Sequence, residues 1–199
     1  AEGVAVVSFV RATHIGRLGE YSEMAASGGM LSLVWASGYS VEAPTAVPFG
    51  GRLPALGTNP VAIGVPGGEE PAMVLDFATT SIAGSKVRIA QNRGQQVPPG
   101  SLVDKDGKPT TDPSGWPEDS SLVPFGAHKG YAIMLANEFF GRVLSGSDAF
   151  SEVDRGGDVM RHQGVTLIVF KADLFQPLAE FTTRADELQR GMRSVPAAI

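Results

Sequence analysis

The sequence predicts an α/β fold in which a mixed, mostly buried sheet is flanked by helices. Apolar, β-branched segments alternate along the chain with segments whose apolar residues recur at helical spacing. The strand candidates are apolar almost throughout, which is typical of strands that are buried on both faces. The length of 199 residues is sufficient for one sizeable core.

The expected strands follow the apolar runs. They are residues 4–10 (VAVVSFV), 30–37 (MLSLVWAS), 61–65 (VAIGV), 72–78 (AMVLDFA) and 165–172 (VTLIVFKA). Helical spacing of apolar residues predicts helices over residues 17–28, 81–93, 129–144 and about 176–193. Residues 129–144 have the longest and most apolar helical pattern, so we expect a central buried helix there.

A stretch rich in Pro, Gly, Asp and Ser runs from about residue 96 to residue 121. It is too long for an ordinary connection between two elements. A lid, an arm that contacts another subunit and a surface excursion are all compatible with this composition.

The composition limits the kinds of molecule that the protein is expected to bind. The formal net charge of −5 and the absence of a basic run argue against nucleic acid. No apolar run approaches the roughly 20 residues of a membrane-spanning helix, so no membrane contact is expected. The chain has no cysteine, which suits a reducing compartment such as the cytoplasm. Its three histidines do not have the spacing of a metal site. We expect a cytoplasmic protein with a small-molecule partner and no metal.

The sequence lacks three common motifs of nucleotide-binding and hydrolytic enzymes. It contains no G-x-G, and therefore no Rossmann dinucleotide fingerprint. It also lacks the phosphate-binding G-x-x-x-x-G-K-[ST] loop and the G-x-S-x-G nucleophile elbow. Conventional nucleotide-binding and hydrolase folds are therefore not predicted.

Two side chains stand where a ligand could bind. His14 follows a predicted strand and precedes a predicted helix, and its imidazole can exchange a proton near neutral pH. Lys129 stands at the start of a predicted helix, where a cation opposes the helix dipole unless an anion such as a cofactor phosphate pairs with it. A capping or surface role for His14 and a solvated Lys129 are the alternatives.

Six motifs, in order, resemble the malate/L-lactate dehydrogenase family that is unrelated to the Rossmann-type enzymes. They are RATHIGRLGEY, VPFGG, GTNPVAIGVP, DFATTSIAGSKV, DPSG and PFGAHKGYAIML. That family also includes ureidoglycolate, sulfolactate and diketogulonate enzymes and piperideine-2-carboxylate reductases. The resemblance implies a non-Rossmann dinucleotide-binding fold of the sulfolactate dehydrogenase-like type. It further implies NAD or NADP as cofactor, interconversion of 2-hydroxy or 2-amino acids with 2-oxo or imino acids, and a homodimer.

The resemblance also implies roles for individual residues. His14 corresponds to the catalytic histidine that exchanges a proton with the substrate oxygen. The implied cofactor-binding residues are Ser37, Thr58, Asn59, Pro60, Asp76, Phe77, Ala78 and Lys129. Arg161, in MRHQG, corresponds more loosely to an arginine near the substrate carboxylate.

Two features of the family are absent from the sequence. Members begin with a helical segment that carries an S-H-G motif and a nearby arginine, and they continue into a P-G-E segment. We therefore expect residues 1–199 to be a single NAD(P)-binding catalytic domain from a longer chain. The start without Met, close to a strand, favours the same interpretation. A catalytically inactive dinucleotide-binding or dimerisation module derived from the family is the alternative.

Overall fold

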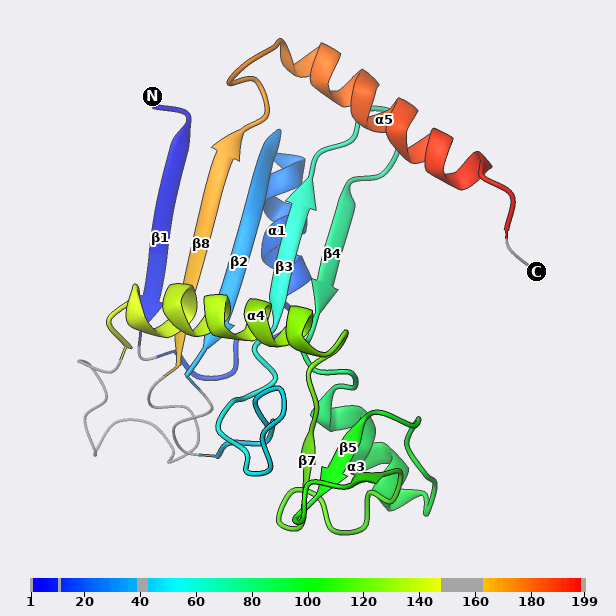
Figure 1. The fold of residues 1–199 in the computed structure, drawn as a ribbon. Coiled ribbons are helices and arrows are strands. Elements are labelled where there is room, and N and C mark those ends of the chain that lie inside the picture. Colours follow the sequence, from blue (N-terminus) through cyan, green and yellow to red (C-terminus); the bar gives the residue numbers. More distant parts are fainter. Residues whose placement is uncertain (1, 11, 39–42, 148–162, 198–199) are drawn as a thin grey trace.

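The computed structural model describes residues 2–10, 12–38, 43–147 and 163–197. A five-stranded sheet has the order β1-β8-β2-β3-β4, and a smaller sheet has the order β6-β5-β7 (Figure 1). The larger sheet contains β1 (Val4–Val10), β2 (Met30–Ser37), β3 (Val61–Val65), β4 (Met73–Phe77) and β8 (Gly164–Lys171). The helices are α1 (Leu18–Ser27), α3 (Gly84–Asn92), α4 (His128–Asn137) and α5 (Leu178–Ser194), and α4 continues as the π-helix η1 (Glu138–Val143).

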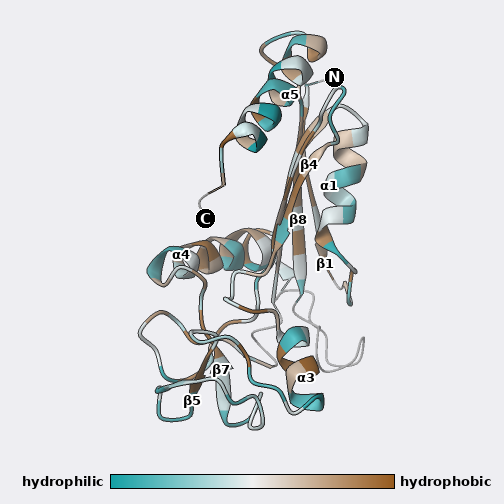
Figure 2. Cartoon of the chain, turned by 90° about the vertical axis from the view of Figure 1, so that its right-hand side faces the viewer, coloured by the Kyte–Doolittle hydropathy of each residue, from teal (hydrophilic) through white to brown (hydrophobic). Residues whose placement is uncertain are grey.

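The predicted fold class is confirmed, because helices flank both faces of the larger sheet. Figure 2 shows this sheet edge-on, with α1 on one face and α4 on the other. Every ladder between the named strands is antiparallel, so the larger sheet is antiparallel and not mixed as expected, and an isolated bridge between Ala46 and Leu122 is parallel. The chain therefore builds this α/β fold without the parallel βαβ units of a Rossmann domain.

Helix α1 packs closely on the middle of the sheet. Its Leu18 belongs to a buried cluster with Val34, Ala36, Ala62 and Val165. Gly64 on β3 makes the close approach possible, since a Cβ atom there would lie only 2.6 Å from the backbone oxygen of Ser22.

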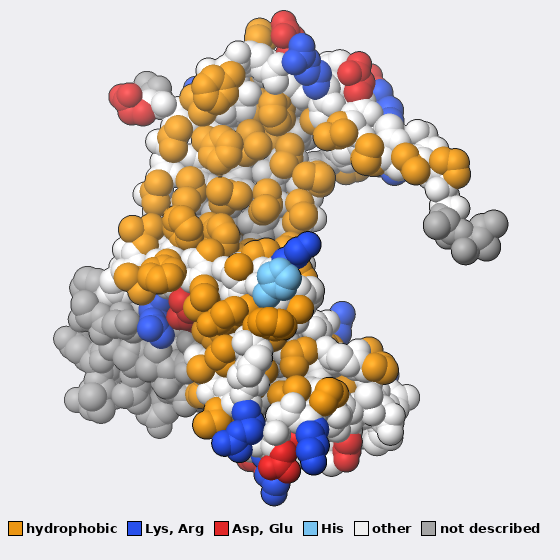
Figure 3. All heavy atoms as spheres, in the orientation of Figure 1, with side chains coloured by type: hydrophobic (Ala, Val, Ile, Leu, Met, Phe, Trp, Pro, Cys, Tyr) orange, Lys and Arg blue, Asp and Glu red, His pale blue; other side chains and the backbone are white. Residues whose placement is uncertain are grey.

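The opposite face of the sheet is largely apolar and open in the described chain. We expected residues 4–10 to be buried on both faces, but Val4 and Val6, on this face, are 53% and 58% exposed. Phe9, which the register places beside Val165 on the α1 face, is 46% exposed. Figure 3 shows apolar side chains gathered over this face between α5 and α4. The expectation of burial was wrong because an apolar strand pattern does not show whether a covering layer comes from the same chain.

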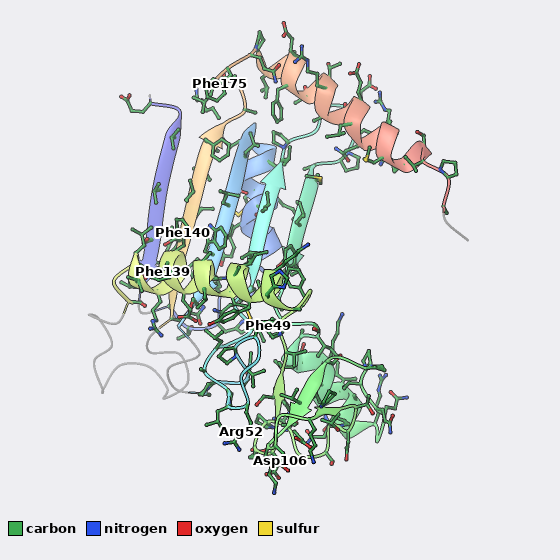
Figure 4. The ribbon with its side chains drawn as sticks, in the orientation of Figure 1. Phe49, Arg52, Asp106, Phe139, Phe140 and Phe175 are labelled. Atoms are coloured by element: carbon green, nitrogen blue, oxygen red, sulfur yellow. The ribbon has the colours of Figure 1, made fainter. Side chains whose placement is uncertain are left out.

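Helix α4 and its continuation η1 lie across one end of the sheet rather than at its centre. The predicted helix over residues 129–144 is present, but its burial is confined to one stripe that includes Gly130, Met134 and Asn137. Phe139 and Leu144 are 63% and 58% exposed, so the expectation of a central buried helix was wrong. Figure 4 shows Phe139 and Phe140 on η1, where Phe140 stacks on Trp35 of β2 with ring centroids 5.2 Å apart.

The long stretch 96–121 folds as part of a small subdomain. It contains β5 (Leu102–Asp104) and β6 (Pro109–Thr110), and β7 (Ser120–Leu122) completes the sheet. Its core comprises Ala46, Leu56, Val87, Val97, Leu102, Trp116, Leu122 and Met134. The sequence did not indicate these strands, because strands of two or three residues leave no periodic pattern.

Helix α5 is fastened to the turn between β3 and β4 by a buried carboxylate. Asp186 is 4% exposed and accepts hydrogen bonds from the backbone nitrogens of Gly68 (3.0 Å) and Glu69 (2.7 Å). The bond from Gly68 is the main reason why the pKa of Asp186 lies below its usual value. Arg190 pairs with Glu69 and Glu70 at the surface of the same junction.

Replacing Asp186 with asparagine is expected to lower the melting temperature most at neutral pH. An amide has one acceptor oxygen in place of two and brings a donor toward the backbone N–H groups. Because the pKa of Asp186 is depressed in the folded chain, its contribution is complete above the unfolded pKa of about 3.9 and is lost as the pH falls through the folded value. The difference between wild type and variant should therefore shrink below about pH 4.

Thermal unfolding between pH 2 and pH 8 measures this difference. Glu187→Gln is the matched control, because Glu187 is the exposed neighbour of Asp186 on the same helix. The control should follow the wild type at every pH. A difference for Asp186→Asn that stays constant down to pH 2 would contradict the assigned role.

Candidate functional site

Five strand ends meet at one edge of the larger sheet. The antiparallel register places Val10 at the end of β1 and Ser37 at the end of β2 opposite the same residue, Gly164. Val61 at the start of β3 likewise pairs with Phe77 at the end of β4. The segments that leave these strand ends, residues 12–16, 57–60 and 78–85, are therefore brought to one edge although they are far apart in the sequence.

A cleft of about 380 Å³ opens at this edge. This volume lies within the roughly 300–1,000 Å³ of small-molecule sites. Five of the predicted site residues line it, namely His14, Ser37, Thr58, Asn59 and Pro60. The structure thus brings together the predicted catalytic histidine and half of the predicted cofactor-binding residues.

His14 is held in a tight turn at the mouth of the cleft. The backbone N–H of Gly16 donates to its Nδ1 atom at 3.1 Å, and Gly16 has a φ of 79°. In the neutral ring this hydrogen bond uses the Nδ1 lone pair and leaves the proton on Nε2, which can then donate a hydrogen bond to a ligand. The N-cap of α1 is Arg17 and has no side-chain hydrogen bond to the helix, so His14 does not act as the helix cap.

The 57–60 turn is braced by Thr79. The Thr79 hydroxyl donates to the backbone oxygens of Thr58 (3.1 Å) and Asn59 (2.9 Å). Asn59 is 3% exposed and has a φ of 40°, in the left-handed region that asparagine tolerates better than most residues. The turn is therefore fixed against the floor of the cleft before any ligand binds.

Asp76, Phe77 and Ala78 reach the same edge of the sheet but do not line the cleft. The Asp76 carboxylate accepts a hydrogen bond from the backbone nitrogen of Gly19 at 2.8 Å, which satisfies an orphan donor in the first turn of α1. Phe77 contacts Phe125 edge-to-face, with ring centroids 5.7 Å apart. In the described chain, Asp76 and Phe77 thus contact other parts of the protein, Gly19 and Phe125, outside the cleft.

Lys129 is the second residue of α4, is exposed, and lies outside the lining of the cleft. The helix begins after Ala127, which has a positive φ of 57°. The first free N–H groups of α4 and the ammonium of Lys129 lie at the same helix end, an arrangement that favours an anion. Arg161, the predicted substrate-binding residue, lies outside the described residues.

The cleft also contains residues that the sequence did not predict. Its walls include Thr45, Ser85, Trp116 and Gln163. Ser85 belongs to the DFATTSIAGSKV motif, so the motif could have indicated it. Trp116 comes from the small subdomain and Gln163 immediately precedes β8, and no local pattern links either of them to His14.

The whole chain, residues 1–199, matches the family model described as malate/L-lactate dehydrogenase. The chain belongs to the malate/L-lactate dehydrogenase family. It is 40% identical over 160 residues to an L-lactate dehydrogenase of Cupriavidus necator, covering 78% of this chain and 45% of that protein. It is 34% identical over 194 residues to a malate/(S)-sulfolactate dehydrogenase of Methanothermus fervidus, covering 96% of this chain and 56% of that protein.

A solved structure gives the same result. The crystal structure of Δ1-piperideine-2-carboxylate reductase from Pseudomonas syringae pvar. tomato superimposes with a TM-score of 0.86 at 32% identity, covering 99% of this chain and 59% of that one. The resemblance and the sulfolactate dehydrogenase-like fold predicted from the six motifs are therefore confirmed. This chain spans about half the length of these members of the malate/L-lactate dehydrogenase family.

Two further features of the described residues bear on the site. No helix among them has the length and apolar character needed to cross a membrane. No three of their His, Asp or Glu side chains are grouped so that they could hold a metal ion.

Proposed function

We propose that the protein is an NAD(P)H-dependent oxidoreductase that interconverts a 2-hydroxy or 2-amino acid with a 2-oxo or imino acid. The observation that carries the proposal is the meeting of His14 with Ser37, Thr58 and Asn59 in one cleft at the sheet edge. Relatives are named L-lactate dehydrogenase, malate/(S)-sulfolactate dehydrogenase and Δ1-piperideine-2-carboxylate reductase, so their substrates belong to these classes.

The residues present fit the nicotinamide end of a dinucleotide. The polar residues Ser37, Thr58 and Asn59 line the cleft together with Pro60. Such a lining suits a flat ring that carries a carboxamide. When bound, the reduced nicotinamide would supply the hydride. Asp76, Phe77, Ala78 and Lys129 would contact the rest of the dinucleotide outside the cleft.

His14 is assigned the proton exchange. During reduction the imidazolium form of His14 donates its Nε2 proton to the substrate oxygen as negative charge develops there, which leaves a neutral ring, and the reverse reaction returns the proton to Nε2. The hydrogen bond from the Gly16 N–H to Nδ1 belongs to the neutral ring with its proton on Nε2, and it is released when the imidazolium forms, because Nδ1 then carries a proton. Arg161 would hold the substrate carboxylate.

Oxidation of NADH and NADPH by pyruvate, oxaloacetate and a cyclic imine tests the proposed function. The protein should oxidise at least one of the two cofactors with at least one of these substrates. Cofactor binding without turnover on a broad panel of 2-oxo acids would contradict the proposal and favour an inactive binding module.

Replacing Lys129 with methionine is expected to raise the Kd of the cofactor about tenfold and to change kcat much less. The side chain is exposed at the start of α4, so it can pair with a phosphate but lies away from the cleft. Titration of NADH and NADPH fluorescence measures the Kd. Lys129→Arg, which keeps the positive charge, is the control and should retain most of the affinity. An unchanged Kd in Lys129→Met would remove Lys129 from the cofactor site.

We also propose that the protein is a homodimer that uses the open face of the sheet. Val4, Val6 and Phe139 are each more than half exposed on or beside this face. Phe175, in the loop between β8 and α5, is 98% exposed (Figure 4). An apolar surface of this extent is unusual in a monomer and typical of a protein interface.

Analytical ultracentrifugation of the full-length protein at micromolar concentration should show a dimer. Val6→Glu should shift the distribution toward monomer, because the introduced charge would have to be buried in the interface. A monomer in the wild type would contradict the dimer.

The absence of cysteine supports a cytoplasmic location, because no disulfide requires an oxidising compartment.

A further inference from the structure

A buried carboxylate behind the cleft holds one of its lining side chains in a single orientation. The Nδ2 group of Asn59 donates to the Oε1 atom of Glu138 at 2.8 Å and to the backbone oxygen of Met134 at 3.1 Å. Both amide protons are thereby used. If the amide turned over, its Oδ1 atom would face these two acceptor oxygens, so the turned orientation is excluded.

The remaining polar atom of this amide is therefore an acceptor of known orientation. Asn59 lines the cleft, and in the described part of the chain no group donates to its Oδ1 atom. A ligand that meets Oδ1 must bring an N–H or O–H donor. The carboxamide of a nicotinamide ring has such a donor.

Glu138 itself is placed by an unusual local structure. It is 9% exposed and is the first residue of the π-helix η1. Single turns of π-helix are rare and frequently occur at functional sites. Arg142, one turn further along, lies with its Nη1 atom 3.3 Å from the Oε2 atom of Glu138. The positive charge of Arg142 offsets part of the cost of burying the carboxylate.

A carboxylate suits these two neighbours. Its two oxygens accept from Asn59 on one side and face the Arg142 guanidinium on the other. A glutamine has one acceptor and one donor end. It would bring its NH2 group either against the Asn59 amide, which would then turn over, or against the guanidinium.

We propose that Glu138 is a positioning residue for hydride transfer, acting through Asn59. It fixes the Asn59 amide with Oδ1 as the acceptor for the carboxamide of the bound nicotinamide, and so sets the angle of the ring in the cleft. This inference rests on the proposed function. Glu138 does not line the cleft, so its effect on the bound ring passes through the Asn59 amide.

The test is a double-mutant cycle in the full-length protein. Glu138→Gln should lower kcat about 10- to 100-fold, since misplacing a reacting group by about 1 Å can cost about 100-fold. The KM of the substrate should change much less. In an Asn59→Ala background the same substitution should cost less than about threefold, because the side chain on which it acts is gone. An equal loss of kcat in both backgrounds, or no loss in the wild-type background, would overturn the proposal.

A second readout does not depend on activity. The side-chain amide signals of Asn59 in an ¹H–¹⁵N spectrum, assigned by their absence in Asn59→Ala, should move in Glu138→Gln and stay in place in the exposed control Glu180→Gln. Unmoved signals in Glu138→Gln would overturn the proposal even if the protein is a dehydrogenase. If the protein turns over no 2-oxo or imino acid, the proposed function fails, and the spectrum still decides whether Glu138 orients Asn59.

Glu138→Asp covers the case in which the glutamine variant does not fold. It keeps the negative charge beside Arg142 and withdraws the oxygen from Asn59. The same loss of kcat and the same dependence on Asn59 are expected. Wild-type kcat in a folded Glu138→Asp variant would overturn the proposal.

Discussion

Replacing His14 with alanine in the full-length protein is expected to lower kcat by about 10²- to 10⁴-fold, the usual contribution of a general acid or base. The Kd of the cofactor should change little, because His14 has its assigned role at the substrate oxygen. His14→Ala removes the hydrogen bond from the Gly16 N–H to the ring, but the turn is also held by the Tyr21 hydroxyl, which donates to the backbone oxygen of Ile15 at 2.8 Å. Truncation of the side chain should therefore leave the cleft in place. Steady-state kinetics and a fluorescence titration measure the two effects separately.

Two further variants sharpen this result. His14→Gln can donate a hydrogen bond but cannot transfer a proton near neutral pH, so it should remain as slow as the alanine variant if proton transfer is the role of His14. His128→Gln is the matched control, because His128 is also exposed but packs edge-on against Phe49 outside the cleft. It should retain kcat. An unchanged kcat in His14→Ala would remove His14 from the mechanism.

Replacing Gly130 with alanine is expected to destabilise the fold by about 3 kcal/mol or more, the upper range for overpacking a core. A Cβ atom at this position would lie 1.9 Å from the backbone oxygen of Phe125 and 2.9 Å from its carbonyl carbon. These are main-chain atoms and cannot rotate away as a side chain would. The turn before α4, or the helix itself, must therefore move. The start of α4 carries Lys129, so cofactor affinity should fall together with stability.

Thermal unfolding measures the effect. For a chain of this length the melting temperature should fall by roughly 6–12 °C, taking about 2–4 °C per kcal/mol. Gly191→Ala is the matched control, because Gly191 lies within α5 and a Cβ atom there would meet nothing within 4 Å. Alanine is the better helix former, so this variant should be unchanged or more stable by up to about 1 kcal/mol. A melting temperature in Gly130→Ala equal to that of the wild type would contradict the predicted clash.

The sequence predicted the elements of the larger sheet better than it predicted their burial. The strand predicted at residues 30–37 coincides with β2, because a run of mostly apolar residues is enough to indicate a strand. The strand at residues 4–10 was also correct, but its exposure depends on what covers the face, which no local pattern records. The strands β5 and β6 escaped prediction because they are too short to show a period.

The candidate site was predictable where a short motif carries it. His14 and the 57–60 turn were indicated by their motifs and lie together in the cleft. Asp76 belongs to such a motif too, yet its described contact is with the backbone of Gly19 at the start of α1, which a motif cannot distinguish from a ligand contact. Trp116, which lines the cleft, and Glu138, which binds Asn59 behind it, were missed because only the tertiary structure brings them to the site. Asn59 and Glu138, for example, are 79 residues apart in the chain.

A structure of the full-length protein with NADH and oxamate, a non-reducible analogue of pyruvate, tests the central claim most directly. The nicotinamide ring should lie beside Thr58, Asn59 and Pro60, and the oxamate oxygen should lie within hydrogen-bonding distance of the Nε2 atom of His14. A dinucleotide bound with its nicotinamide away from this cleft, or an oxamate out of reach of His14, would contradict the assignment of the cleft as the site of hydride transfer.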